Sequence, residues 1–132
     1  MIYIAHPYWH DDEAVRAARI EATAAVAKAL LDRQLLAVAP CLFIGRLDAA
    51  ERARRDLWTH WSLHILQRVA SSVLVLPYDG WQESDGLKRA LLVARLLGLP
   101  IYSPAAHTLD RPEIGSVAWY GGPAFIDYIN SL

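Results

Sequence analysis

A chain of 132 residues can bury one full hydrophobic core but is too short for two, so we expect a single domain. Its 13 Lys and Arg against 14 Asp and Glu give a net charge of −1, with no overall attraction to nucleic acid or an anionic membrane. No apolar run approaches the ~18 residues of a membrane span, the N-terminal residues lack a signal-peptide pattern, and the single Cys41 excludes an internal disulfide. We expect a cytoplasmic protein with a small neutral or singly charged ligand.

The first part of the chain predicts a strand, a helix and a second strand. Residues 1–5 are β-rich, and residues 35–40 are an apolar run that ends at a proline. Between them, residues 12–33 repeat apolar side chains at the spacing of one helical face. That stripe consists of Val15, Ala18, Ala22, Val26 and Ala29. Arg19 falls on the same stripe, so we expect it either to reach a ligand crevice or to extend along its packed stem to solvent.

The second part continues the alternation. Residues 48–70 have a helical pattern with a break near Arg55, and residues 72–77 are the most convincing buried strand. A helix over about 87–97 leads into a strand at 100–104. Alternating strands and helices predict an α/β fold, a flavodoxin-like or Rossmann-like three-layer sandwich with a mostly parallel sheet of four or five strands.

Ligands in such sheets bind beyond the carboxyl ends of the strands. We therefore expect three loops, residues 5–11, 40–46 and 77–86, to line the ligand crevice. Ser84 can cap the following helix or help to bind an anion at its N-terminus. Asp79 can begin a tight turn, or it can contact a sugar hydroxyl or a leaving base.

Aromatic residues in these loops also have two possible roles. Trp81, Tyr8 and Trp9 can stack on a base or cover the edge of the core. Asp85 would repel a phosphate within an anion site, so we expect its carboxylate to turn aside. These alternatives depend on where the fold places each side chain.

A metal site is a further alternative. His60 and His64 lie one helical turn apart with Asp56 one turn earlier, as metal ligands can. The segment lacks the glutamate of a zinc-protease helix, and the nearby Trp58 and Trp61 favour packing or a subunit contact. We therefore expect no metal.

Three segments together resemble the nucleoside 2-deoxyribosyltransferase-like superfamily: YIAHPY at the start, SVLVLPYDGWQESDG in the middle, and GLPIY after the last helix. The chain is most similar to a small bacterial branch of uncharacterised domains with a GW…S…G signature, over about residues 1–104. The resemblance implies a flavodoxin-like fold and cleavage or transfer at the N-glycosidic bond of a nucleoside or nucleoside 5′-monophosphate, without a cofactor.

The resemblance also places the nucleophile. In the superfamily a glutamate four residues after the motif glycine attacks the anomeric carbon and carries the sugar covalently. Four residues after Gly86 this chain has Ala90, and a methyl group cannot attack. Three explanations stay open: an engineered Glu→Ala change, a natural binding-only descendant, or replacement by another carboxylate, for which Glu83 and Asp85 are the neighbours.

The leading hypothesis is an N-glycosidase or deoxyribosyltransferase type of protein whose active form carries glutamate at position 90. The alternative is a non-catalytic nucleotide-binding or regulatory module. By resemblance, Tyr3 lines the sugar pocket and Asp79 assists departure of the base. The expected substrate-binding residues are His6, Pro7, Tyr8, Arg19, Gly80, Trp81, Ser84, Asp85 and Gly86.

The resemblance gives two further expectations. Ser84 resembles a serine that contacts phosphate in the monophosphate hydrolases, but this chain has His6 and His10 where those enzymes have a Gly- and Arg-rich loop. Superfamily members build their sites at dimer contacts, so we expect a homodimer or higher homo-oligomer through Trp58 and Trp61. Residues 105–132 are expected to be a tail or lid with a C-terminal helix.

Overall fold

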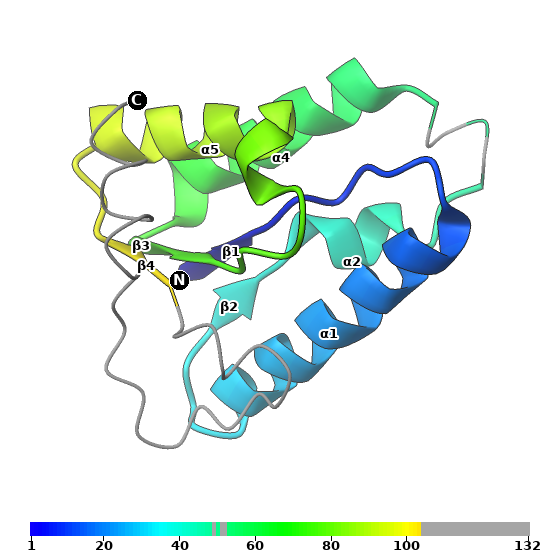
Figure 1. Ribbon diagram of the computed structural model, residues 1–132. Coiled ribbons are helices and arrows are strands. Elements are labelled where there is room, and N and C mark those ends of the chain that lie inside the picture. The colour runs from blue at the N-terminus through cyan, green and yellow to red at the C-terminus, as the bar shows by residue number, and fades with distance from the viewer. Residues whose placement is uncertain (49, 51–52, 104–132) are drawn as a thin grey trace.

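The computed structural model describes residues 1–48, 50 and 53–103, so the tail or lid expected at 105–132 lies outside the described residues. Strands and helices alternate, and the strands form a parallel sheet in the order β2-β1-β3-β4 (Figure 1). The predicted α/β sandwich is confirmed. The elements are β1 Ile2–Ala5, α1 Glu13–Leu31, β2 Ala37–Val38, α2 Pro40–Ile44, α4 Arg55–Val69, β3 Ser72–Val75, the short 3-10 helix η1 Trp81–Glu83, α5 Asp85–Leu96 and β4 Ile101–Tyr102.

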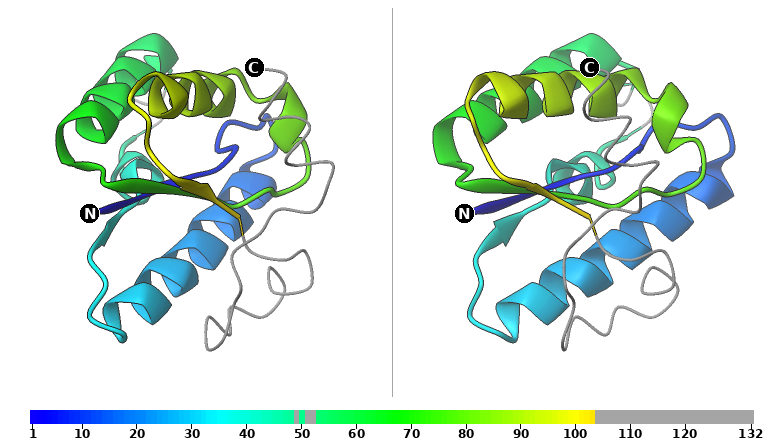
Figure 2. Two further views of the ribbon diagram at one scale, coloured as in Figure 1. Left: turned by 90° about the vertical axis from the view of Figure 1, so that its left-hand side faces the viewer. Right: turned by 60° about the vertical axis from the view of Figure 1, so that its left-hand side comes forward.

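Helices cover both faces of the sheet, with α4 and α5 on one side and α1 on the other (Figure 2). Because side chains alternate along a strand, β1 sends Tyr3 and Ala5 into the core beneath α4 and α5, and Ile4 into the core beneath α1 and α2. β1 and β3 pair in register from Ile2 and Ser72 onward, so their carboxyl ends lie side by side. The loops that follow these strands meet at one edge of the sheet.

The buried face of α1 differs from the predicted stripe. Ala18 is exposed, and the buried face runs through Arg19, Thr23, Val26 and Leu30. The alanines of α1 occur on all sides of the helix, so their spacing does not identify the buried face. Arg19 and Thr23 stay buried because their polar side chains form hydrogen bonds inside the protein.

Several predicted boundaries also change. Residues 40–46, expected as a loop, contain the short helix α2, which begins at a proline as helices often do. The helix α5 begins at Asp85, with the Ser84 hydroxyl accepting a hydrogen bond from the Leu87 N–H at 3.3 Å. Leu97, the last residue of the predicted helix, is the C-cap of α5 and is 50% exposed. The break expected near Arg55 is confirmed, since α4 begins at that residue.

Candidate functional site

Three cavities adjoin at the carboxyl edge of the sheet, with volumes of about 80, 290 and 540 Å³. Trp9 and Ser84 line all three, so the cavities are neighbouring parts of one depression. We call them the inner, the middle and the outer cavity, in order of increasing volume. This is the edge at which the fold class predicts a ligand.

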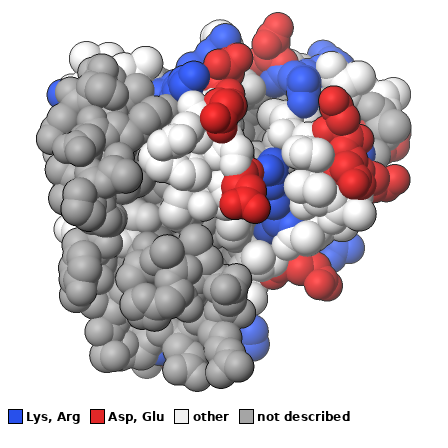
Figure 3. All heavy atoms as spheres, viewed as in Figure 1, with Lys and Arg blue, Asp and Glu red and all other residues white. Residues whose placement is uncertain are grey.

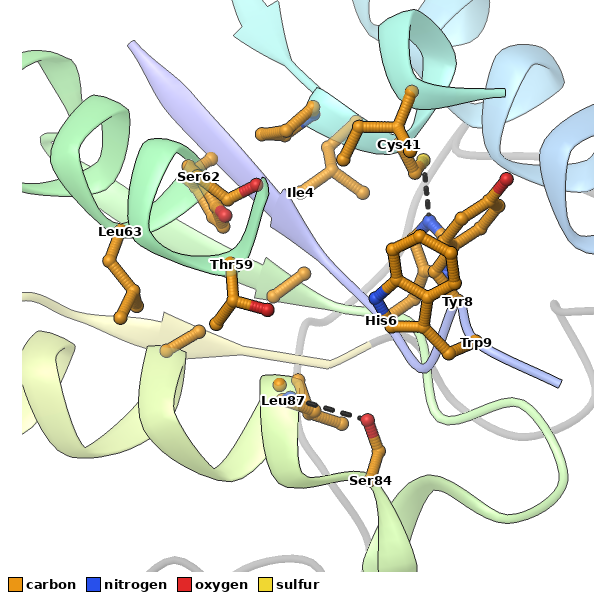
Figure 4. A pocket seen from close by; sticks show the side chains of 16 residues that line it. Ile4, His6, Tyr8, Trp9, Cys41, Thr59, Ser62, Leu63, Ser84 and Leu87 are labelled. Carbon is orange, nitrogen blue, oxygen red and sulfur yellow. Dashed lines mark hydrogen bonds between the residues drawn. The ribbon is translucent and has the colours of Figure 1, made fainter. Parts of the chain in front are cut away.

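The inner cavity brings together side chains from four parts of the fold (Figure 4). Of the residues expected from the sequence, it contains Tyr3, His6, Tyr8, Ser84, Gly86 and Ala90. The residues that α4 supplies, Thr59, Ser62 and Leu63, were not predicted from the sequence. Cys41 lies in the segment 40–46 that was expected to line the crevice, but it was not singled out as a site residue. No Asp, Glu, Lys or Arg is among the described residues that line this cavity.

His6 forms a partly buried pair with Cys41. The His6 Nδ1 lies 3.0 Å from the Pro7 carbonyl oxygen, and the Nε2 lies 2.7 Å from the Cys41 Sγ. A carbonyl only accepts, so Nδ1–H donates to Pro7 and the Cys41 thiol donates to Nε2. Burial lowers the pKa of His6 to about 4 and raises the pKa of Cys41 to about 12. Both groups are therefore neutral at pH 7, and both His6 nitrogens are engaged within the protein.

The same pair belongs to a longer polar network beneath the inner cavity. Cys41 forms a side-chain hydrogen bond with Thr23 of α1, and the Thr23 hydroxyl lies 3.0 Å from the phenol oxygen of Tyr78. Burial raises the pKa of Tyr78 to about 12, so this phenol is neutral as well. The network connects α1, α2 and the loops after β1 and β3, and it thereby fixes the floor of the depression.

Arg19 holds in place the two loops that border the outer cavity. Its Nη2 donates to the Asp79 carbonyl at 2.7 Å, and its Nη1 donates to the Tyr8 and Trp9 carbonyls, each at 3.4 Å. The residue is only 8% exposed, so it does not extend to solvent. Burial lowers the pKa of the guanidinium, and the nearby Asp79 opposes that shift. Arg19 lines the outer cavity together with Pro7 and Gly80 and joins the two loops that border it.

Replacing Arg19 with methionine is expected to lower the free energy of unfolding by about 2 kcal/mol, because the carbonyls it binds lose their donor. Chemical denaturation measures this change. Arg16 is the matched control, since it lies on the same helix and donates to the His10 and Asp11 carbonyls at an exposed site. Arg16→Met is expected to change stability by less than about 0.5 kcal/mol. Equal losses in the two variants would contradict the role given to Arg19.

The loop after β3 places its expected residues in different environments. Gly80 has φ 83°, the left-handed conformation that completes a turn after Asp79. Trp81 packs against the core beneath α5, which is the second of its two expected roles. Asp85 lines the middle cavity with Glu83 beside the N-terminus of α5, so its carboxylate does not turn aside from the anion site expected there.

The start of α5 leaves open space at Gly86. A Cβ placed on this residue would meet nothing within 4 Å, so the fold itself does not require glycine there. Gly86 lines both the inner and the middle cavity. Glycine within a helix reduces stability relative to alanine.

The histidines of α4 lie on its exposed surface. His60, His64 and Asp56 are exposed, and across residues 1–48, 50 and 53–103 no three His, Cys, Asp or Glu side chains gather as metal ligands. Trp58 and Trp61 instead contact each other and Phe43, with ring centroids 5.4 to 5.9 Å apart.

The surface carries charges of both signs. Acidic and basic side chains are interspersed on the face seen in Figure 3. No helix within the described part of the chain is long and apolar enough to cross a membrane.

Two comparisons bear on identity. No curated protein matches the sequence, so the resemblance to nucleoside 2-deoxyribosyltransferases stays a prediction. A family model does match residues 1–103, and the chain therefore belongs to the family described as Domain of unknown function (DUF1937).

Proposed function

We propose that this chain binds a nucleoside or a nucleoside 5′-monophosphate in the depression and, with Ala90 present, does not cleave its N-glycosidic bond. One observation carries this proposal. Ala90, at the position where the resemblance expects the nucleophilic glutamate, lines the inner cavity beside Tyr3 and Ser84. Since no carboxylate lines that cavity among the described residues, the geometry favours binding over glycosyl transfer.

Trp9 supports recognition of a base. Its ring borders all three cavities and is held between Tyr8, with ring centroids 4.8 Å apart, and the Arg55 guanidinium, 4.8 Å from the ring centroid. A base can stack on Trp9 where neither neighbour covers the ring, or it can replace the Arg55 guanidinium on the indole face.

The beginning of α5 supports recognition of a phosphate where the ligand carries one. Its first backbone N–H groups and the helix dipole favour an anion. Arg55 and Arg89 line the middle cavity beside this helix end, although the carboxylates of Asp56, Glu83 and Asp85 line it too. We place the phosphate beside the two arginines of the middle cavity and the uncharged sugar in the inner cavity, where no charged side chain of the described residues lies.

N-glycosidase or transferase activity is the competing function. Glu83 and Asp85 are the carboxylates that could replace the missing glutamate, and both line the middle cavity rather than the inner one. Their carboxylates would therefore approach a sugar in the inner cavity from a different side than a side chain at position 90. The proposal extends to a cytoplasmic homodimer, for which the aromatic surface of Phe43, Trp58 and Trp61 is the candidate contact.

The test combines binding and turnover. The protein is titrated with common nucleosides and their 5′-monophosphates in a calorimeter, and the same mixtures are analysed for free base by chromatography. We expect saturable binding of at least one compound and no release of base. Release of base by the unmodified chain would establish the competing enzymatic function, and failure of every compound to bind would overturn the proposal.

Gly86→Ala gives a second test with two opposite readouts. The methyl group is expected to raise the free energy of unfolding by about 0.5 to 1 kcal/mol, because alanine favours the helix. It is also expected to weaken nucleotide binding, because it occupies space shared by the inner and middle cavities. Gln82→Ala is the control, since Gln82 is exposed and lines none of the three cavities. Unchanged affinity in Gly86→Ala would show that the ligand does not approach this residue.

A further inference from the structure

The inner cavity is lined by uncharged side chains, several of which carry hydroxyl groups. The hydroxyls belong to Tyr3, Tyr8, Thr59, Ser62 and Ser84. A neutral group that bears hydroxyls suits such a cavity, because it can exchange hydrogen bonds there without burying a charge.

Most of these hydroxyls already have partners within the protein. Ser62 forms a side-chain hydrogen bond with the Tyr3 phenol, and Ser84 caps α5 by accepting from the Leu87 N–H. The half-buried Thr59 hydroxyl has no hydrogen-bond partner in the part of the chain that the structure describes. A hydroxyl in such a site is stabilised when a ligand or water pairs with it. Thr59 is thus the side chain of this group whose hydroxyl stays wholly available to a ligand.

Thr59 also stands where the inner cavity meets the middle one. It lines both, as do Trp9, Ser84 and Gly86. Figure 4 shows Thr59 projecting from α4 and Ser84 from the start of α5 toward the space that separates these two helices. A ligand that extends from one cavity into the other must therefore pass Thr59.

We infer that Thr59 selects ribose over 2′-deoxyribose, an inference that rests on the proposed function. In the binding mode that the proposed function implies, the anomeric carbon of the sugar faces Ala90. Ala90 lines the same cavity as Thr59. The 2′-carbon is bonded directly to the anomeric carbon, so the 2′-hydroxyl also lies in the inner cavity. Thr59 can donate to it and accept from it. A 2′-deoxy sugar leaves Thr59 unpaired, and sites that hydrogen-bond a substrate hydroxyl discriminate against analogues that lack it.

The experiment compares dissociation constants of ribonucleosides and their 2′-deoxy counterparts by titration calorimetry. For the unmodified chain, we expect ribonucleosides to bind about tenfold more tightly, as one hydrogen bond allows. Thr59→Val keeps the branched shape without the hydroxyl and is expected to reduce this ratio to about one, chiefly through weaker ribonucleoside binding. Thr59→Ser keeps the hydroxyl and is expected to keep the preference. Thr59→Ala replaces the valine variant if that variant fails to fold.

The outcomes separate this inference from the proposed function. Equal affinities of the unmodified chain for both series, or an unchanged ratio in Thr59→Val, overturn the role of Thr59 and leave nucleoside binding intact. If the unmodified chain binds neither series, the proposed function and this inference fail together.

Discussion

Ala90→Glu is expected to convert a chain that releases no base into one that does. The new carboxylate would enter the inner cavity from the first turns of α5, at the place where the resemblance expects a nucleophile. Burial among uncharged side chains raises the pKa of such a carboxyl, so activity is expected to increase with pH until the group is ionised. Chromatography of free base from nucleosides and their 5′-monophosphates measures the effect.

Ala90→Gln is the matched control, because it has nearly the same size and no carboxylate. Both variants place a longer polar side chain where a 4% exposed alanine now packs, so each is expected to lose about 1 to 3 kcal/mol of stability. Denaturation curves show whether both remain folded. Base release by Ala90→Glu alone would establish glycosyl chemistry at this position. Folded variants that bind nucleosides but both remain inactive would contradict the assignment of position 90.

Lowering the pH from about 7 to about 4 is expected to weaken the fold by about 3 kcal/mol through His6 alone. Its folded pKa of about 4 lies below the ordinary value of 6.5, so the unfolded chain takes up a proton first. The contribution is fully present above pH 6.5 and is lost as the pH falls toward 4. Protonation would also place a hydrogen on Nε2, where the Cys41 thiol now donates.

His6→Asn isolates this effect. Urea denaturation at pH 7 and pH 4 gives the change in unfolding free energy for each protein. The variant is expected to show a pH dependence smaller by about 3 kcal/mol, even if its stability at pH 7 is lower. The same pH dependence in both proteins would show that His6 is not the group responsible.

The alternation of apolar runs and helical segments was sufficient to predict the layers and the edge at which the cavities lie. Long-range partners were not predictable, because no local spacing encodes them. His6 and Cys41 are 35 positions apart in the sequence. Each follows a strand, but the hydrophobic periodicity does not indicate that the two side chains contact each other. In the sequence, Thr59 has no feature that distinguishes it from other helix residues. It lines the inner cavity because the fold packs α4 beside α5.

The error on the buried face of α1 has a related cause. Alanine fits both buried and exposed helix positions, so the predicted stripe included the exposed Ala18 and could not foresee that Thr23 would be fully buried. A buried threonine needs a partner, and Tyr78 lies 55 residues away.

Arg19 has a mechanical consequence. One guanidinium holds the backbone of both the loop after β1 and the loop after β3, so these loops are expected to shift together with α1 as one rigid unit. Widening the depression for an incoming molecule then depends on the opposite wall, where α4 supplies Thr59 and Arg55. Hydrogen exchange would detect this asymmetry as slower opening on the side of α1 than at the first turn of α4.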